Sequence, residues 1–177
     1  MPRFQKERLI FGGLLLALIA IGEIVLHELY LPAWPVFVVM LFFFLAHMDR
    51  KVAPNIIIGA LAGIGCTMLA KPVVGALAPI TGLSGGRLVY LLNVVGLIIL
   101  FRETAPVVFN DYLFAFFLIS GLAAKTYRPR PDPFVWMAVT LVGGTIIILG
   151  ILTIRKIVAG LARKRAIAAA RLRLPAQ

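Results

Sequence analysis

The order of apolar and polar positions divides this chain into long hydrophobic runs instead of short alternating ones. Cutting the runs at proline, glycine and charged clusters gives six segments, at residues 9–29, 35–48, 55–69, 88–101, 110–124 and 134–154. Uninterrupted apolar runs of this kind are typical of membrane helices and not of the strands of a membrane barrel. The pattern therefore predicts an all-α integral membrane protein with six transmembrane segments.

The fifth segment, 110–124, begins with a polar head. Asn110 and Asp111 follow Pro106 at the start of an apolar run that reaches roughly 20 Å as a helix, less than the hydrocarbon layer of about 30 Å. The run therefore has its head within the membrane, or is tilted, or is re-entrant. Because helix N-termini attract anionic and polar groups, Asn110 and Asp111 are the leading candidates for a solute or pore contact. The alternative is that they only cap the helix.

The segments also divide into two sets of three, which predicts an internal duplication. The short segments after Pro35 and Pro106 are both opened by proline and rich in phenylalanine, and residues 61–65 resemble residues 141–145. An odd number of segments per copy makes the second copy inverted in the membrane. Candidate repeats are 9–70 and 85–154, within one transmembrane domain of residues 1–154. Short proline-interrupted segments at matching positions of two halves are typical of transporters and channels.

This layout, a span, a proline-opened short helix and a further span, repeated once, resembles families of small bacterial six-helix inner-membrane proteins. Some of these have no assigned function and some are thought to pass small solutes. The resemblance covers most of the chain in layout, and its local motifs are Pro35-Val36-Phe37 and the Ala-Pro-Val-Val-Phe sequence at 105–109. It implies the bacterial inner membrane and a small-solute transport role, and it assigns no residue roles.

Composition agrees with a membrane domain, because 62% of the 177 residues are hydrophobic and only 14% are charged. The formal charge of +11 is unevenly placed. With six crossings, most of the 18 Lys and Arg residues share a side with the N-terminus, the exceptions being Lys71, Arg87, Lys125, Arg128 and Arg130. Since cytoplasmic loops are enriched in basic residues, both termini are expected in the cytoplasm.

The two ends of the chain lead to separate expectations. Residues 155–177 form a basic amphipathic tail, expected to lie along the inner leaflet and to bind anionic lipid through Arg163, Lys164 and Arg165. Nucleic-acid binding is not expected, because no aromatic residues accompany these charges. The first apolar run is expected to be retained and not cleaved as a signal peptide, since it carries Glu23 and lacks a small-residue cleavage site.

Three further polar residues within the spans are candidate solute contacts. Glu23 and His27 are one helical turn apart and share a face, where they could share a proton or hold a polar solute. The alternative is that both lie near the outer interface. Asn93 in the fourth segment either contacts solute or bonds a neighbouring helix.

The glycines and phenylalanines of the spans serve either in packing or in a solute path. Gly59, Gly63 and Gly65, like Gly143 and Gly144, favour close helix packing, with a narrow solute path as the alternative. The phenylalanines at 42–44 and 114–117 are expected in the core or facing lipid, with a gate as the alternative.

No motif indicates catalysis. The chain lacks metal-ligand spacings of His and Cys, a serine elbow and a phosphate-binding loop, so no enzyme activity, cofactor or metal is expected. The leading hypothesis is a channel or facilitator for a small neutral or weakly charged solute, lined by the heads of the second and fifth segments. The alternative is a non-transporting subunit or scaffold. Partners are the lipid bilayer and either further copies of the chain or another membrane protein.

Overall fold

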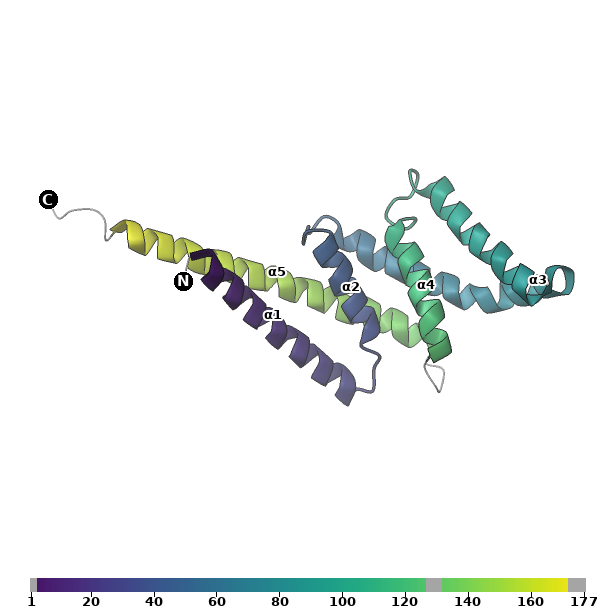
Figure 1. The fold of residues 1–177 in the computed structure, drawn as a ribbon, viewed down its shortest axis with the longest axis horizontal. Helices are drawn as coiled ribbons and strands as arrows, with labels where there is room; N and C mark the ends of the chain where they lie inside the picture. Colours follow the sequence, from purple (N-terminus) through teal and green to yellow (C-terminus); the bar gives the residue numbers. More distant parts are fainter. Residues whose placement is uncertain (1–2, 127–131, 172–177) are drawn as a thin grey trace.

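The computed structural model describes residues 3–126 and 132–171, with side chains placed at 6–126 and 132–164. Its elements are five helices, α1 (Arg3–Glu28), α2 (Trp34–Leu45), α3 (Ala53–Phe101), α4 (Asp111–Thr126) and α5 (Pro133–Arg171). Figure 1 shows α1 beside α5 at one end of the molecule and the bent α3 at the other, with α2 and α4 between them. The all-helical prediction is confirmed for the described residues.

Helix α3 joins two segments that the sequence separates. It runs through Pro72 and Pro79 and leaves helical geometry at Gly82, where φ is 71°. Each proline removes one backbone hydrogen bond, but in apolar surroundings continuing the helix satisfies the remaining backbone groups. The described residues therefore form five helices, three of them long and apolar enough to cross a membrane, where the sequence predicts six separate segments.

Gly82 bends α3 back on itself, so the helix has two arms, residues 53–81 and 83–101 (Figure 1). A positive φ is available to glycine at little steric cost, which explains why the bend falls there. The Tyr90 hydroxyl of the second arm donates to the carbonyl oxygen of Cys66 in the first arm at 2.5 Å. The third and fourth predicted segments thus correspond to the first and second arms.

The two short helices each pack on a glycine pair of a longer helix. A Cβ at Gly143 of α5 would meet Val36 of α2 at 2.6 Å, and a Cβ at Gly144 would meet Val39 at 3.2 Å. Gly59 and Gly63 of α3 lie in the same way against α4. The expectation of close packing at these four glycines is confirmed, whereas Gly65 has open space beside it.

Both short helices run parallel to their glycine-bearing partners. Along α2 and α5, Trp34 contacts Trp136 at the start, and Arg155 donates to the carbonyl oxygen of Met48 beyond the end of α2. Along the first arm of α3 and α4, Gly59 meets Asn110 and further on Thr67 meets Ser120. In each of these two pairs the N-terminal ends of the helices therefore lie together at one end, and the C-terminal ends lie together at the other.

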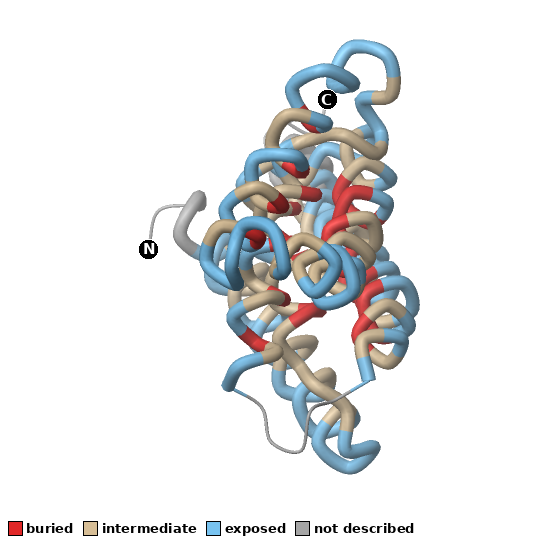
Figure 2. The backbone as a smooth tube through the Cα atoms, turned by 90° about the vertical axis from the view of Figure 1, so that its right-hand side faces the viewer, coloured by how far each residue is buried: buried red, intermediate tan, exposed pale blue. Residues whose placement is uncertain are grey.

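The buried residues form two clusters. The larger joins α2, α5 and the first arm of α3 to Phe116 and Ala123 of α4. The smaller joins the second arm of α3 to Leu113 and Phe117 of α4. In Figure 2 the buried positions lie on the inward sides of the central helices, with exposed positions around the outside.

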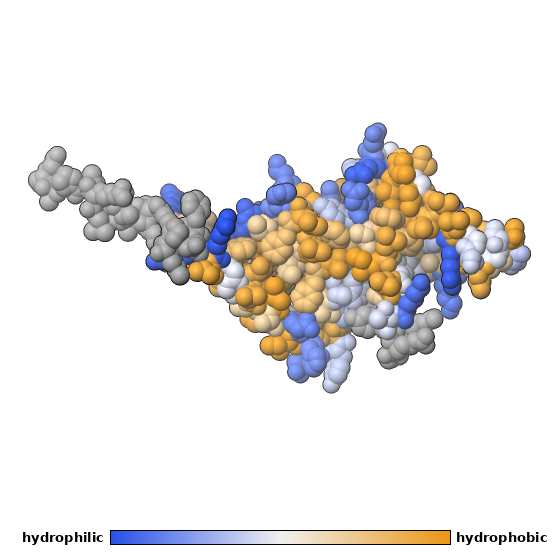
Figure 3. Space-filling model, in the orientation of Figure 1, coloured by the Kyte–Doolittle hydropathy of each residue, from blue (hydrophilic) through white to orange (hydrophobic). Residues whose placement is uncertain are grey.

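The exterior is strongly apolar. Among the described residues, three helical stretches are long and apolar enough to cross a membrane, namely Lys6–Glu28, Ala53–Phe101 and Pro133–Lys164, and Trp34–Leu45 is a shorter apolar helix. Figure 3 shows hydrophobic surface over most of one face, with hydrophilic residues mainly at its upper and lower margins. Length, hydropathy and surface together are those of a helical membrane protein.

Helix α5 continues without interruption from its apolar part into the basic tail and ends at Arg171. The tail is therefore an extension of the last helix through the described residues and not a separate surface helix. Arg163 and Lys164 are exposed, while the side chain of Arg165 lies outside the described residues.

Candidate functional site

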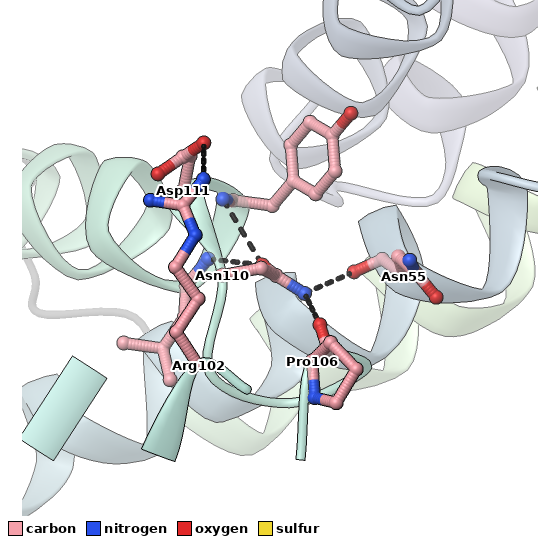
Figure 4. Close-up of polar contacts among 7 residues, drawn as sticks. Asn55, Arg102, Pro106, Asn110 and Asp111 are labelled. Carbon is pink, nitrogen blue, oxygen red and sulfur yellow. Dashed lines mark hydrogen bonds and ion pairs between the residues drawn. The ribbon is translucent and has the colours of Figure 1, made fainter. Parts of the chain in front are cut away.

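The head of α4 is organised by the side chain of Asn110. Its Oδ1 accepts hydrogen bonds from the backbone N–H groups of Tyr112 at 3.0 Å and Leu113 at 3.1 Å (Figure 4). Asparagine at this position satisfies two of the N–H groups that the first turn of a helix leaves unpaired. Asn110 therefore caps α4, which was the alternative to a solute contact.

The amide nitrogen of Asn110 connects α4 to the rest of the fold. Nδ2 donates to the carbonyl oxygens of Val107 at 2.9 Å, Pro106 at 3.0 Å and Asn55 at 3.2 Å. The last of these bonds reaches the beginning of α3. Gly59, one turn further along α3, leaves the space in which the carboxamide lies. In this conformation both polar atoms of the Asn110 side chain are therefore engaged within the chain.

Asp111 points away from this network, as Figure 4 shows. Its Oδ2 forms an ion pair with a guanidinium nitrogen of Arg102 at 3.0 Å, with side chains 75% and 58% exposed respectively. Among exposed groups such a pair contributes about 0–1 kcal/mol. The two paired residues are nine positions apart in the sequence.

The other candidates are not brought together with the head of α4. Glu23 and His27 are exposed on α1, a helix whose apolar span is 0% buried within the chain. Asn93 is exposed on the second arm of α3, and its Nδ2 donates to the carbonyl oxygen of Val89 in its own helix at 2.9 Å. The five predicted contacts thus lie on separate surfaces and do not form one site within this chain.

An aromatic chain between α2, α4 and α5 is the feature that the sequence did not reveal. Ring centroids are separated by 5.2 Å from Tyr112 to Phe42, 6.0 Å from Phe42 to Phe116, 6.1 Å from Phe116 to Trp34 and 5.3 Å from Trp34 to Trp136. Phe116 is 0% and Trp136 1% exposed. These five side chains, called the aromatic chain below, connect the head of α4 to the starts of α2 and α5.

The tryptophan end of the aromatic chain carries two buried donors. Within the described residues, neither Nε1 of Trp34 nor Nε1 of Trp136 has a hydrogen-bond partner. The rings meet edge to face at 82°, a geometry that offers at most a weak N–H···π contact. Buried donors of this kind are rare, because each one forgoes its hydrogen bond with water without replacement.

A cluster of hydroxyl groups lies on the other side of α4. The hydroxyl oxygens of Thr67 and Ser120 are 2.5 Å apart, and the Thr67 hydroxyl also lies 3.1 Å from the carbonyl oxygen of Phe117. Ser120 is fully buried and lies 2.6 Å from the carbonyl oxygen of Phe116. These groups satisfy one another and hold α4 to the first arm of α3, as polar side chains do between membrane helices.

Across the described residues, no group of three or more His, Cys, Asp or Glu side chains is placed to hold a metal ion. The chain matches no family model, and neither a curated protein nor a solved structure is significantly similar to it.

Proposed function

We propose that this protein is a channel or facilitator for a small neutral or weakly charged solute in a bacterial inner membrane, with both termini in the cytoplasm. The solute passes between α2 and α4, along the aromatic chain, which is closed in this conformation. The observation that carries the proposal is the pair of unpartnered indole donors at the buried end of that chain. A solute oxygen or a water molecule would satisfy them.

Helix lengths support the placement of the passage. At 1.5 Å per residue, the 12 residues of α2 rise about 18 Å and the 16 residues of α4 rise about 24 Å, less than the hydrocarbon thickness of about 30 Å. Polar backbone at the ends of such short helices is tolerated in a bilayer where protein or water surrounds it. Both helices lie among α3 and α5, which supply that environment.

The pairing of helices supports the inverted duplication. Each short helix runs parallel to a long partner and meets a pair of glycines on it, Gly143 and Gly144 for α2 and Gly59 and Gly63 for α4. In the proposed arrangement α1, α2, the two arms of α3, α4 and α5 cross in turn. The repeats are then 9–70 and 85–154, with the passage between the equivalent short helices.

The preference for neutral solutes follows from the groups beside the passage. The five side chains of the aromatic chain carry a phenol hydroxyl and two indole donors, and none of the five is a carboxylate, an ammonium or a guanidinium group. An ion would lose its hydration there without a compensating charge. Asp111 and Arg102 lie beside the Tyr112 end of the aromatic chain, where they bind each other.

Solute flux tests the proposal. Purified protein in liposomes is exposed to a panel of small neutral solutes, and the rate of volume change is followed by light scattering. We expect flux above protein-free liposomes, reduced by Trp136→Phe, which removes one donor and keeps an aromatic ring. Asp111→Ala tests the Tyr112 end of the aromatic chain. Glu23→Gln, on the exposed side of α1, serves as the control and is expected to leave flux unchanged.

A second candidate function rests on α1. Glu23 and His27 are exposed side chains of α1, a helix whose Leu18 packs against Gly150 of α5. A carboxylate turned toward lipid is costly. A second copy or another membrane protein packed on α1 would satisfy both groups, as expected of a scaffold or subunit. Absence of flux for every solute, together with a stoichiometric partner in the purified sample, would favour this function over transport.

A further inference from the structure

We propose that a hollow between the first turns of α1 and the distal part of α5 binds the phosphate group of a membrane phospholipid. The hollow has a volume of about 460 Å³, within the usual range of small-molecule sites. Arg8 of α1 and Arg155 of α5 line it together with Glu7, Phe11, Val158 and the edge of Met48. Its α5 residues belong to the beginning of the basic tail, one to two helical turns before Arg163, and it shares no residue with the aromatic chain.

The guanidinium group of Arg155 is held in place and still has free N–H donors for an anion. One of its terminal nitrogens donates to the carbonyl oxygen of Met48 at 2.8 Å, which fixes the guanidinium beside the connection between α2 and α3. A guanidinium has five N–H donors in a planar fork, so one bond to a carbonyl leaves donors for a phosphate. Fixing the side chain beforehand lowers the entropy lost on binding. Arg8 supplies a second cation from the opposite wall.

The walls of the hollow favour a lipid over a free anion. Phe11 and Val158 provide apolar surface next to the two cations, as required by a molecule with a charged head and an apolar body. Helix α1, which forms one wall, carries exposed apolar side chains beyond the hollow, among them Leu9 and Leu16, and this surface is open to acyl chains. Glu7 places a negative charge in the same hollow. Its carboxylate can pair with the amine of a head group that carries one beside its phosphate.

The hollow lies at the right depth in the membrane. Arg155 is 22 residues after Pro133, the first residue of the apolar stretch of α5, which corresponds to about 33 Å along the helix and matches a hydrocarbon layer of about 30 Å. Arg8 lies two residues after the start of the apolar stretch of α1. Both cations thus fall at the level of the head groups on the side where basic residues are most abundant.

Native mass spectrometry of the full chain in mild detergent tests this inference, with phosphatidylglycerol and phosphatidylethanolamine as separate titrants. We expect Arg8→Ala and Arg155→Ala each to weaken lipid binding about tenfold, the loss expected for one charge-assisted hydrogen-bonding partner. Lys156→Ala is the matched control, because it removes the same charge one residue away and does not line the hollow. It is expected to leave binding unchanged.

Two further variants separate the site from general attraction. Arg155→Lys keeps the charge but loses the fork, so we expect binding between that of the wild type and Arg155→Ala. Glu7→Gln is expected to strengthen phosphatidylglycerol binding by removing a like charge. Arg8→Ala keeps the bond between Arg155 and Met48, so a loss of binding there does not arise from loss of that bond.

Two results would overturn the inference. Equal, small losses in Arg8→Ala, Arg155→Ala and Lys156→Ala would mean that the lipid responds only to overall charge. Displacement of phosphatidylglycerol by inorganic phosphate at the same concentration would identify a soluble-anion site with no role for the apolar walls.

Discussion

Gly59 of α3 lies directly against the carboxamide of Asn110, so that a Cβ at position 59 would overlap the Oδ1 atom of that side chain. The same carboxamide caps α4 and bonds to the start of α3. The approach of the two helices and the start of α4 therefore depend on one small residue and one amide. The other glycines of α3 give the contrast needed to test this.

Gly59→Ala is expected to destabilise the protein by about 1–3 kcal/mol, the usual range for inserting a methyl group into a filled space. The matched control is Gly65→Ala in the same arm of α3, where a Cβ meets nothing within 4 Å. Alanine there is expected to be neutral or slightly stabilising, because it favours the helix. Thermal unfolding in detergent measures both. Equal destabilisation by the two variants would contradict the packing described for Gly59.

Asn110→Ala is expected to lower stability by about 1–2 kcal/mol through loss of the cap. Hydrogen exchange locates the effect, because the amides of Tyr112 and Leu113 lose their acceptor and should exchange faster than amides near Ser120. Asn110→Asp keeps the acceptor oxygens and loses the Nδ2 donor, so it should protect those two amides and still loosen the contact with Asn55. Unchanged exchange at Tyr112 in Asn110→Ala would be inconsistent with the cap.

The hydroxyl pair of Thr67 and Ser120 is expected to couple α3 and α4. A double-mutant cycle with Thr67→Val and Ser120→Ala should give an interaction free energy of about 0.6 kcal/mol, and at most about 1.7, as for other bonds between membrane helices. A cycle that pairs Thr67→Val with Thr145→Val on α5 is the control, since the Thr145 hydroxyl bonds within its own helix. An interaction free energy as large in the control cycle as in the Thr67 and Ser120 cycle would contradict a direct coupling of α3 and α4 through this hydroxyl pair.

The ion pair between Arg102 and Asp111 is expected to contribute little. Arg102→Ala and Asp111→Ala should each change stability by less than about 1 kcal/mol, because both side chains are largely exposed. Raising the salt concentration should reduce even that difference. Stability curves at low and high salt give the comparison, and a large salt-independent loss would indicate that Asp111 is buried in the working protein.

Several parts of this structure follow from local sequence. The apolar runs predicted helices, the glycines at 59, 63, 143 and 144 predicted close packing, and Asn110 beside Pro106 allowed an N-cap as an alternative. These inferences succeed because they depend on neighbours within a few positions. Helix length, capping and small-residue faces are local properties.

Other parts required the tertiary structure. The prolines at 72 and 79 are ordinary stop signals, yet α3 continues through them to Gly82, because apolar surroundings favour uninterrupted helix. The partnership of Arg102 with Asp111 depends on how residues 103–110 loop back. The aromatic chain joins residues from three helices, and no single stretch of sequence shows that Phe42 meets Phe116 or that Trp34 meets Trp136.

The proposed passage follows the aromatic chain, and its narrowest point is expected at Phe116. Phe116 touches both Phe42 and Trp34 and lies at its middle, fully buried. A smaller side chain at this position opens space next to the unpartnered tryptophan donors. Phe134, an exposed phenylalanine at the start of α5, provides a control of the same size outside the chain of rings.

The most direct test of the account is therefore solute flux through Phe116→Ala in liposomes, compared with the wild type and with Phe134→Ala. Phe116→Leu serves as a milder second variant, since the alanine variant removes about 3–5 kcal/mol of packing in a typical core. We expect both Phe116 variants to pass small neutral solutes several-fold faster than the wild type, with Phe134→Ala unchanged. Flux through folded Phe116→Leu and Phe116→Ala no faster than through Phe134→Ala would contradict a passage between α2 and α4.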